Sequence, residues 1–389
     1  MIGSWMQRTA VYWTVYVQTH SPFMLGVGVF AVQFPSFLFS LFGGIVADRY
    51  NRFKVLLITQ GVSMIQAVLL TLLVLFTHYT VFEILALSVL LGIINAFDMP
   101  ARQSLVQDMI ENKKDLGNAI ALNSTMNNIA RFIGPVVSGI ILDHLGLGRC
   151  FMLNALSFIA VITTLLMMRL PAYVPKVHTQ NAFKGLKDGL KYLKASPSIG
   201  RVILLIALYS LMIMPYFTLL PVIAKMILNG NATTYGYLNS VTGIGAIGGA
   251  IFLASLKPNV NLNRVLFIIM SVLGIGLILL SFSHNLLLAL FFAAITGFAI
   301  MSLSTIGNTL LQLNSSTEMR GRVISYFAMA YFGLQPLGSL LIGSISNYVS
   351  TPTTIFCQGI AAVLIAILFF PYLWKEVRLE KKVHYTTLL

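Results

Sequence analysis

Long apolar stretches alternate with short polar joints along nearly the whole chain. Crossing a bilayer core of roughly 30 Å takes about 20 apolar residues of α-helix, and most of these stretches reach that length. Hydropathy and the Pro, Gly and polar clusters predict twelve membrane-spanning helices, six on each side of a central joint. The predicted spans are 1–19, 23–47, 54–77, 81–107, 117–143, 149–170, 201–226, 234–256, 264–283, 286–313, 322–349 and 353–374.

The first predicted span is short and carries Arg8 in its middle. We therefore expect a truncated first helix that continues an apolar segment before Met1. A secretory signal peptide is the alternative, but its basic first region and small-residue cleavage site are missing.

The two halves of the chain resemble each other. Gly43 and Gly44 return as Gly248 and Gly249, and 103–107 resembles 308–312 at the same offset. The repeat predicts an N-terminal six-helix bundle at 1–170, a cytoplasmic linker with an amphipathic helix at 171–200, a C-terminal bundle at 201–374 and a cytoplasmic tail at 375–389. Parallel repeats of this kind place a substrate site near the bilayer midplane, between the halves.

Charge orients the predicted spans. Only 9% of residues are charged and 57% are hydrophobic, and most of the 25 Lys and Arg fall on alternate joints. By the positive-inside rule these joints face the cytoplasm, together with the C-terminus and the N-terminus of a complete chain. The net charge of +14 is then a topological signal, and we expect no nucleic-acid partner. The linker helix either lies on membrane lipids or is solvated.

A charged string, 43–54, lies at the predicted membrane–cytoplasm boundary. An acid and two bases there can form a charge network that holds one gate state. The string resembles the loop between the second and third helices of the major facilitator superfamily. The matching residues are Gly44, Asp48, Arg49 and Arg52. Asn51 replaces the usual Gly, and we expect it to adopt a left-handed turn. The resemblance implies a network that joins Asp48, Arg52 and Asp108.

Four further segments, 97–103, 118–124, 130–139 and 319–323, resemble the bacterial branch of enterobactin exporters and macrolide efflux pumps. The resemblance covers essentially the whole chain. It implies an all-α membrane protein of the major facilitator fold, located in the bacterial inner membrane. It also implies drug or siderophore efflux by proton antiport.

Arg131 is the leading candidate for a functional residue. It lies near the middle of its span, where a charged side chain costs at least about 2.5 to 3.5 kcal/mol. The charge requires a partner: a substrate anion, Asp98, or the amides of Asn123, Asn127 and Asn128 on the same helix. The alternative is a structural Arg that ties helices together.

Two prolines predict flexible points in matching helices. Pro135 leaves the carbonyl of Arg131 without its helical donor, and Pro336 does the same for Phe332. With Gly134 and Gly139, Pro135 resembles the Gly-Pro motif in the fifth helix of the superfamily's antiporters. Pro215 and Pro221 predict interruptions in the seventh span.

Acids and aromatic residues complete the set of candidates. Asp98 is four residues before Arg102, so a local ion pair is one interpretation and a proton site the other. Glu83 is either a proton entry point or a helix-end acid. Arg8 is a second cavity cation or a residue near the inner surface. Further cavity-lining candidates are Tyr12, Trp13, Tyr16, Tyr209, Tyr216, Asn239, Thr305, Asn308 and Gln335.

The expected function is export of a small amphipathic or anionic organic solute, with protons as the coupling ion. No phosphate-binding loop is present, so a gradient must supply the energy. We expect no enzyme activity, no cofactor and no metal site, and treat Cys150 and Cys357 as small apolar residues. Two alternatives remain: a lipid or lysolipid flippase of the same fold, and a non-transporting relative.

Overall fold

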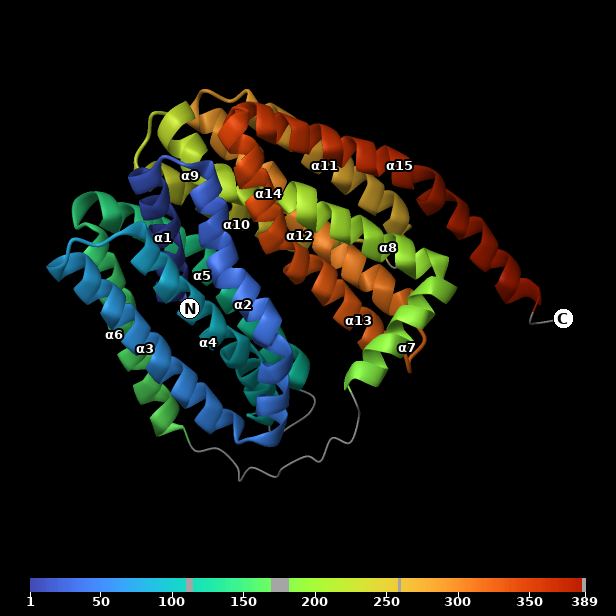
Figure 1. Ribbon diagram of the computed structural model, residues 1–389. Helices are drawn as coiled ribbons and strands as arrows, with labels where there is room; N and C mark the ends of the chain where they lie inside the picture. Colours follow the sequence, from blue (N-terminus) through green and yellow to red (C-terminus); the bar gives the residue numbers. More distant parts are fainter. Residues whose placement is uncertain (110–114, 169–181, 258–259, 387–389) are drawn as a thin grey trace. The chain divides into compact units, whose positions relative to one another are not determined.

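The structure is a computed structural model that describes residues 1–109, 115–168, 182–257 and 260–386. All regular elements in these ranges are helical (Figure 1). The first six helices are α1 (Ile2–Thr19), α2 (Pro22–Arg49), α3 (Arg52–Phe76), α4 (Val81–Asp108), α5 (Leu116–His144) and α6 (Leu147–Met167). The others are α7 (Ala182–Ala195), α8 (Pro197–Leu208), α9 (Leu220–Val222), α10 (Ala232–Ala254), α11 (Leu262–Ser281), α12 (Leu286–Asn314), α13 (Arg320–Ala328), α14 (Leu334–Tyr348) and α15 (Thr351–Thr386).

Helices occupy all twelve predicted positions, which confirms the fold class. Among the described residues, 10 helices are long and apolar enough to cross a membrane. Helices α1 and α5 are not among them. Both carry polar side chains, such as Gln7 and Arg131, that are buried or half-buried against other helices. Helix α15 continues to Thr386, through much of the predicted tail.

The predicted interruptions of the seventh span are present. After α8 the chain forms a π turn (Tyr209–Ile213), a 3₁₀ turn (Met214–Leu219), the short α9 and a second π turn (Ile223–Ile227). A π turn at Met329–Gly333 likewise precedes Pro336 and separates α13 from α14. A proline removes one backbone donor, so the turn before it must rearrange its hydrogen bonds. Helix α5 remains α-helical through Pro135.

The chain divides into two compact units. Unit 1 comprises Met1–Thr179, Thr218–Ser240 and Ser339–Tyr348. Unit 2 comprises Gln180–Phe217, Val241–Gly338 and Val349–Leu389. In unit 1, α2 packs against α4, α3 against α6, and α1 against α5 and α6; in unit 2, α11 packs against α12 and α15. The two bundles inferred from the repeat, 1–170 and 201–374, stay a prediction.

Glycines allow the closest helix contacts in unit 1. A Cβ atom on Gly43 of α2 would lie 1.9 Å from the carbonyl oxygen of Ala96 on α4. A Cβ on Gly92 of α4 would lie 2.3 Å from the carbonyl oxygen of Val32 on α2. The backbones of α2 and α4 therefore touch, as small residues permit in membrane bundles.

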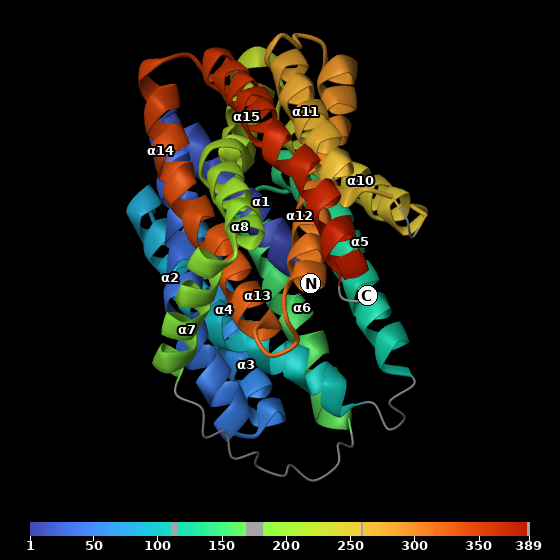
Figure 2. The same ribbon diagram turned by 90° about the vertical axis from the view of Figure 1, so that its right-hand side faces the viewer.

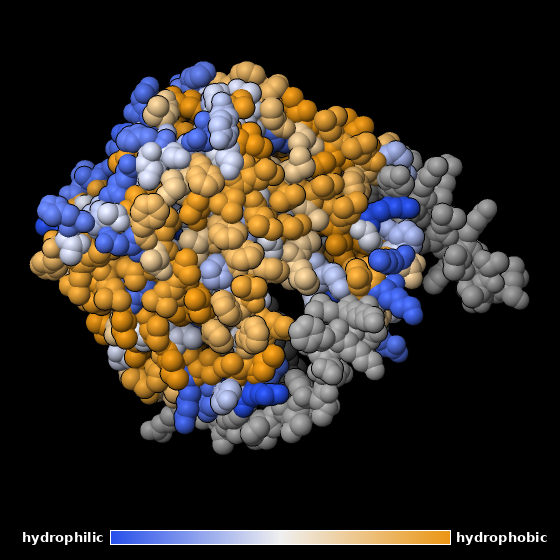
Figure 3. Space-filling model, in the orientation of Figure 1, coloured by the Kyte–Doolittle hydropathy of each residue, from blue (hydrophilic) through white to orange (hydrophobic). Residues whose placement is uncertain are grey.

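The surface fits a lipid environment. Large apolar side chains of α3 are exposed along one face of the helix, namely Ile58, Ile65, Leu69, Leu72 and Phe76. Figure 3 shows that hydrophobic residues dominate the face in view and that hydrophilic residues gather toward its edges. In a soluble protein this much exposed apolar surface would cause aggregation.

The predicted linker helix is present as α7 and packs on α13 within unit 2 (Figure 2). A Cβ on Gly189 would lie 2.8 Å from the ring of Tyr326. The hydroxyl of Tyr192 accepts a hydrogen bond of 3.3 Å from the backbone N–H of Ser316, and this bond lowers the pKa of Tyr192. Contact of α7 with lipids stays a prediction.

Candidate substrate and proton sites

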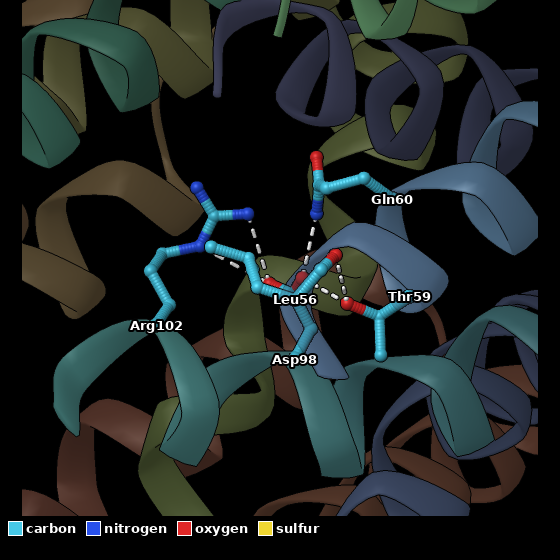
Figure 4. A network of polar contacts seen from close by, with 5 residues as sticks. All are labelled: Leu56, Thr59, Gln60, Asp98 and Arg102. Atoms are coloured by element: carbon cyan, nitrogen blue, oxygen red, sulfur yellow. Dashed lines mark hydrogen bonds and ion pairs between the residues drawn. The ribbon is translucent and has the colours of Figure 1, made fainter. Parts of the chain in front are cut away.

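Asp98 lies at the centre of a buried polar network between α3 and α4 (Figure 4). Its Oδ2 accepts bonds of 3.1 and 2.9 Å from Nε and Nη2 of Arg102. Its Oδ1 accepts a 2.6 Å bond from Gln60 Nε2 and lies 2.8 Å from the hydroxyl of Thr59. Asp98 is only 8% exposed. The local ion pair with Arg102 is thus present, and the side chains of Gln60 and Thr59 add two further contacts to the carboxylate.

Two arginines converge on one indole in unit 1. The guanidinium carbon of Arg8 lies 4.8 Å from the centre of the Trp5 ring, and that of Arg131 lies 5.7 Å from it. Both distances are typical of cation–π contacts. A Cβ on Gly134 would lie 2.5 Å from Trp5 Cβ, so α1 and α5 approach each other closely here. We call Trp5, Arg8 and Arg131 the cation–indole site.

Aromatic side chains of α1 and α10 lie beside this site. Tyr12 and Tyr235 are both buried, and Tyr12 lies one helical turn after Arg8 on α1. Trp13 stacks on Tyr235 with ring centres 6.0 Å apart. Sequence reasoning identified Arg8, Arg131, Tyr12 and Trp13 but missed Trp5 and Tyr235. The spacing of Trp5 and Arg8, three residues apart on a helix, was the available signal for Trp5.

The charged loop forms only part of its predicted network among the described side chains. Arg52 Nη2 lies 4.0 Å from Asp48 Oδ1, and Arg52 Nε donates a 3.2 Å bond to the carbonyl of Ala47. Arg49 is exposed. The side chain of Asp108 is outside the described part of the structure. The three-member network therefore stays a prediction.

Asn51 and Gly44 of this loop differ from what the sequence predicts. The left-handed turn at Asn51 was wrong: Asn51 has φ −60° and ψ 111°, and its side chain accepts bonds from the backbone N–H groups of Phe53 and Lys54. Asn51 therefore caps the N-terminus of α3. Gly44 has no neighbour within 4 Å of an added Cβ, whereas the adjacent Gly43 makes the close contact with α4.

Other predicted residues of unit 1 make local contacts. Glu83 Oε2 accepts a 2.6 Å bond from the backbone N–H of Thr80, the geometry of a helix-end acid. Asn127 is exposed and donates to the carbonyl of Asn123 at 2.9 Å. Roles for these residues in a substrate or proton pathway stay predictions.

Of the remaining cavity candidates, Tyr16 and Asn239 belong to unit 1 and the other five to unit 2. Tyr209 and Tyr216 are fully buried, and the Tyr216 hydroxyl lies 2.9 Å from that of Thr296. Asn308 accepts a 3.2 Å bond from Gln312. Thr305 and Gln335 are half-buried. The structure does not bring these five residues together with the cation–indole site inside one unit, so a shared cleft stays a prediction.

A second feature that sequence reasoning missed joins α5 to α10 inside unit 1. Asp143 accepts bonds from the backbone N–H groups of Ala232, at 3.2 Å, and Thr233, at 2.8 Å, and a 2.5 Å bond from the Thr233 hydroxyl. Thus a carboxylate of α5 caps the N-terminus of α10. Asp143 resembles an ordinary exposed loop acid in the sequence, and its partner is 90 residues away.

Close backbone packing continues from this cap along both helices. A Cβ on Gly139 would lie 2.6 Å from the carbonyl oxygen of Ala232, and a Cβ on Gly236 would lie 2.5 Å from that of Pro135. The hydroxyl of Ser240 donates a 2.6 Å bond to the carbonyl of Phe132. Gly134, Pro135 and Gly139 therefore lie in helix contacts, and helix bending at them and at Pro336 stays a prediction.

Among the described residues no group of three or more His, Cys, Asp and Glu could hold a metal ion. Cys150 is buried and Cys357 is exposed, and both are free thiols.

An all-helical fold with ten helices long and apolar enough to cross a membrane, among the described residues, is typical of a multi-pass membrane protein. A family model described as transmembrane secretion effector matches residues 1–384, and the chain belongs to this family of the major facilitator superfamily. It is therefore a transporter and not an enzyme.

Characterised relatives agree with this assignment, and solved structures share the fold. The chain is 28% identical to the staphyloferrin A transporter of Staphylococcus aureus, over 95% of this chain and 92% of the relative. It is 26% identical to the enterobactin exporter EntS of Salmonella typhi, over 91% and 84%. A POT family transporter in complex with 5-aminolevulinic acid has the same fold, with a TM-score of 0.76, 12% identity and 96% and 94% coverage.

Proposed function

We propose that this chain exports a small anionic organic solute with an apolar or aromatic body across the bacterial inner membrane. Proton antiport drives export, and alternating access exposes the site to one side of the membrane at a time. The chain's family and its relatives, named for staphyloferrin A transport and enterobactin export, support a siderophore-like cargo.

The observation that carries the proposal is the convergence of Arg8 and Arg131 on Trp5. Two guanidinium groups that lie against one indole attract an anion that can contact both of them. Guanidinium groups donate paired hydrogen bonds to carboxylates, while the indole offers apolar surface to an organic body. The site thus fits an amphipathic anion.

Asp98 supports proton coupling. A proton on Asp98 would remove the negative charge that holds Arg102, and it would weaken the bonds from Gln60 and Thr59. Binding of one proton therefore rearranges the contacts between α3 and α4. This is the type of two-state element that proton antiport requires.

The cargo is identified by comparing metabolites inside and outside cells that contain or lack the gene. Transport of that cargo is then measured in vesicles with an imposed pH gradient. We expect Arg131→Ala and Arg8→Ala to lower Vmax/KM by roughly 10- to 100-fold, the loss of about one charged hydrogen-bonded contact. Arg131→Lys should retain part of the rate, because it keeps the charge.

Arg149→Ala is the matched control, because Arg149 is an exposed arginine at the start of α6. Unchanged transport in both Arg131 variants, at equal membrane abundance, would contradict the assignment. A pump that moves a fluorescent lysolipid and no soluble metabolite would instead be a flippase.

A further inference from the structure

Three buried amide side chains connect four helices of unit 1. Asn154 Nδ2 on α6 donates a 2.6 Å bond to Gln7 Oε1 on α1. Gln7 Nε2 donates a 3.0 Å bond to Gln66 Oε1 on α3, and Gln66 Nε2 donates a 3.0 Å bond to the carbonyl of Leu87 on α4. Asn154, Gln7 and Gln66 are 2%, 2% and 1% exposed. We call these three residues the amide relay.

The hydrogen bonds of the relay run in one direction, from Asn154 through Gln7 and Gln66 to the carbonyl of Leu87. Gln7 accepts one bond and donates one, so both ends of its amide are held by different helices. Hydrocarbon offers no water to replace a lost partner, and an unpaired amide there is costly. Rotation of α1 about its axis would break both bonds of Gln7 at once.

Small residues allow α1 to pack closely against its neighbours around the amide relay. A Cβ on Gly3 would lie 2.3 Å from Asn154 Oδ1, so α1 and α6 touch at this level. The hydroxyl of Ser138 on α5 donates a 2.9 Å bond to the carbonyl of Met6. Helix α1 is thus held by α3, α5 and α6, although it is too polar to be counted among the apolar spans.

The relay lies within the turn of α1 that carries the cation–indole site. Trp5 and Arg8 are three residues apart and share one side of the helix. Gln7 is next to Arg8, and successive residues are separated by about 100° around a helix axis. The side of α1 that faces α3 and α6 therefore determines where Trp5 and Arg8 point.

We infer that Gln7 is a positioning residue: through Asn154 and Gln66 it fixes the rotation of α1 and so places Trp5 and Arg8 for binding an organic anion. The inference rests on the proposed function for its biological meaning. Its geometric content, the placement of Trp5 beside two cations, is measurable without any cargo.

The test uses Trp5 as the reporter. The chain has three tryptophans, so Trp13→Phe and Trp374→Phe leave Trp5 as the single emitter. Emission is quenched with iodide, an anion that the two arginines attract, and with neutral acrylamide. We expect Gln7→Met and Gln66→Met to shift the emission maximum of Trp5 and to lower the iodide-to-acrylamide quenching ratio severalfold.

Gln358→Met is the matched control. Gln358 is another buried amide, 3% exposed, and donates to the carbonyl of Met212 in unit 2 at 2.8 Å. Its loss should lower thermal stability and leave both Trp5 signals unchanged. Trp5 signals of Gln7→Met and Gln66→Met that match the control would overturn the inference.

Gln66→Met decides the question if Gln7→Met does not accumulate, because Gln66 belongs to neither α1 nor α5. The result is separable from the cargo assignment. Altered Trp5 signals, together with normal transport by the Arg8 and Arg131 variants, would support the positioning role and reject the proposed substrate site.

Discussion

The side chain of Asp98 on α4 joins α3 and α4 through its hydrogen bonds. Its carboxylate is nearly buried, yet it accepts two bonds from Arg102 and one from Gln60. Removal of one partner from a buried ion pair leaves the other charge uncompensated, and that loss is larger than the net gain from the intact pair. The two residues therefore have to be tested together.

We expect Asp98→Asn to lower stability by roughly 1 to 3 kcal/mol, less than for a fully buried pair because Arg102 is partly exposed. Asp98→Asn with Arg102→Gln should recover part of this loss, because no charge is then left alone. Melting midpoints in detergent measure both effects. Asp48→Asn is the control: Asp48 is more exposed and its pair with Arg52 is 4.0 Å long. A double variant less stable than Asp98→Asn would contradict this account.

Adjacent glycines of α2 should respond to the same change with opposite sign. Gly43→Ala places a methyl group against the Ala96 carbonyl and should cost about 1 to 3 kcal/mol, because two backbones must separate. Gly44→Ala meets no neighbour and should stabilise the helix by about 0.5 to 1 kcal/mol. Thermal unfolding of the two variants, in parallel, measures both. Equal midpoints would show that α2 and α4 are not in backbone contact.

At the level of elements, the cap that Asp143 provides makes one helix end depend on another helix. Asn231 accepts a 3.1 Å bond from the N–H of Thr234, while the N–H groups of Ala232 and Thr233 are satisfied from α5. Separation of α5 and α10 therefore leaves two donors and a hydroxyl to be hydrated. By the predicted orientation, this contact lies on the outer side of the membrane.

We expect Asp143→Ala to loosen this contact by about 0.5 to 2 kcal/mol, the usual effect of losing an N-terminal cap. A cysteine at buried Ser240, in a chain with Cys150 and Cys357 replaced by Ala, reports the opening. An impermeant maleimide added outside the cell should label it roughly 2- to 30-fold faster in the Asp143 variant. His144→Ala is the control, and equal labelling rates in all three proteins would rule out a latch at Asp143.

The distribution of basic residues over the whole molecule predicts its orientation in the membrane. The Lys-bearing segment around α7 and the C-terminal tail should lie on one side of the membrane, because both carry the excess of basic residues. Single cysteines at Lys191 and in the tail, labelled in intact cells and in inverted vesicles, measure this. Labelling of the two positions from opposite sides would refute the twelve-span topology.

The sequence was sufficient to predict the positions of the helices but not the contacts between them. Apolar length and turn residues predicted a helix at each of the twelve positions where the structure has one, because a membrane helix must satisfy its own backbone hydrogen bonds. Asn51 was misjudged because a cap and a left-handed turn favour the same residue. Tyr235 and Asp143 act through partners on other helices, so no local pattern marks them. The pairing of Gln7 with Gln66 and Asn154 required the packed structure for the same reason.

The contact between α5 and α10, the α5–α10 seam, is made largely by main-chain atoms. Gly139 and Gly236 have no side chains, so each lies directly against a carbonyl of the other helix, that of Ala232 or Pro135. Side chains elsewhere on the same helices, such as that of Arg131, can therefore vary without disturbing how the seam closes. The binding side chains of such a transporter can therefore change while this helix contact is kept. Inhibitors directed at the seam would, for the same reason, meet fewer routes to resistance than inhibitors directed at the binding residues.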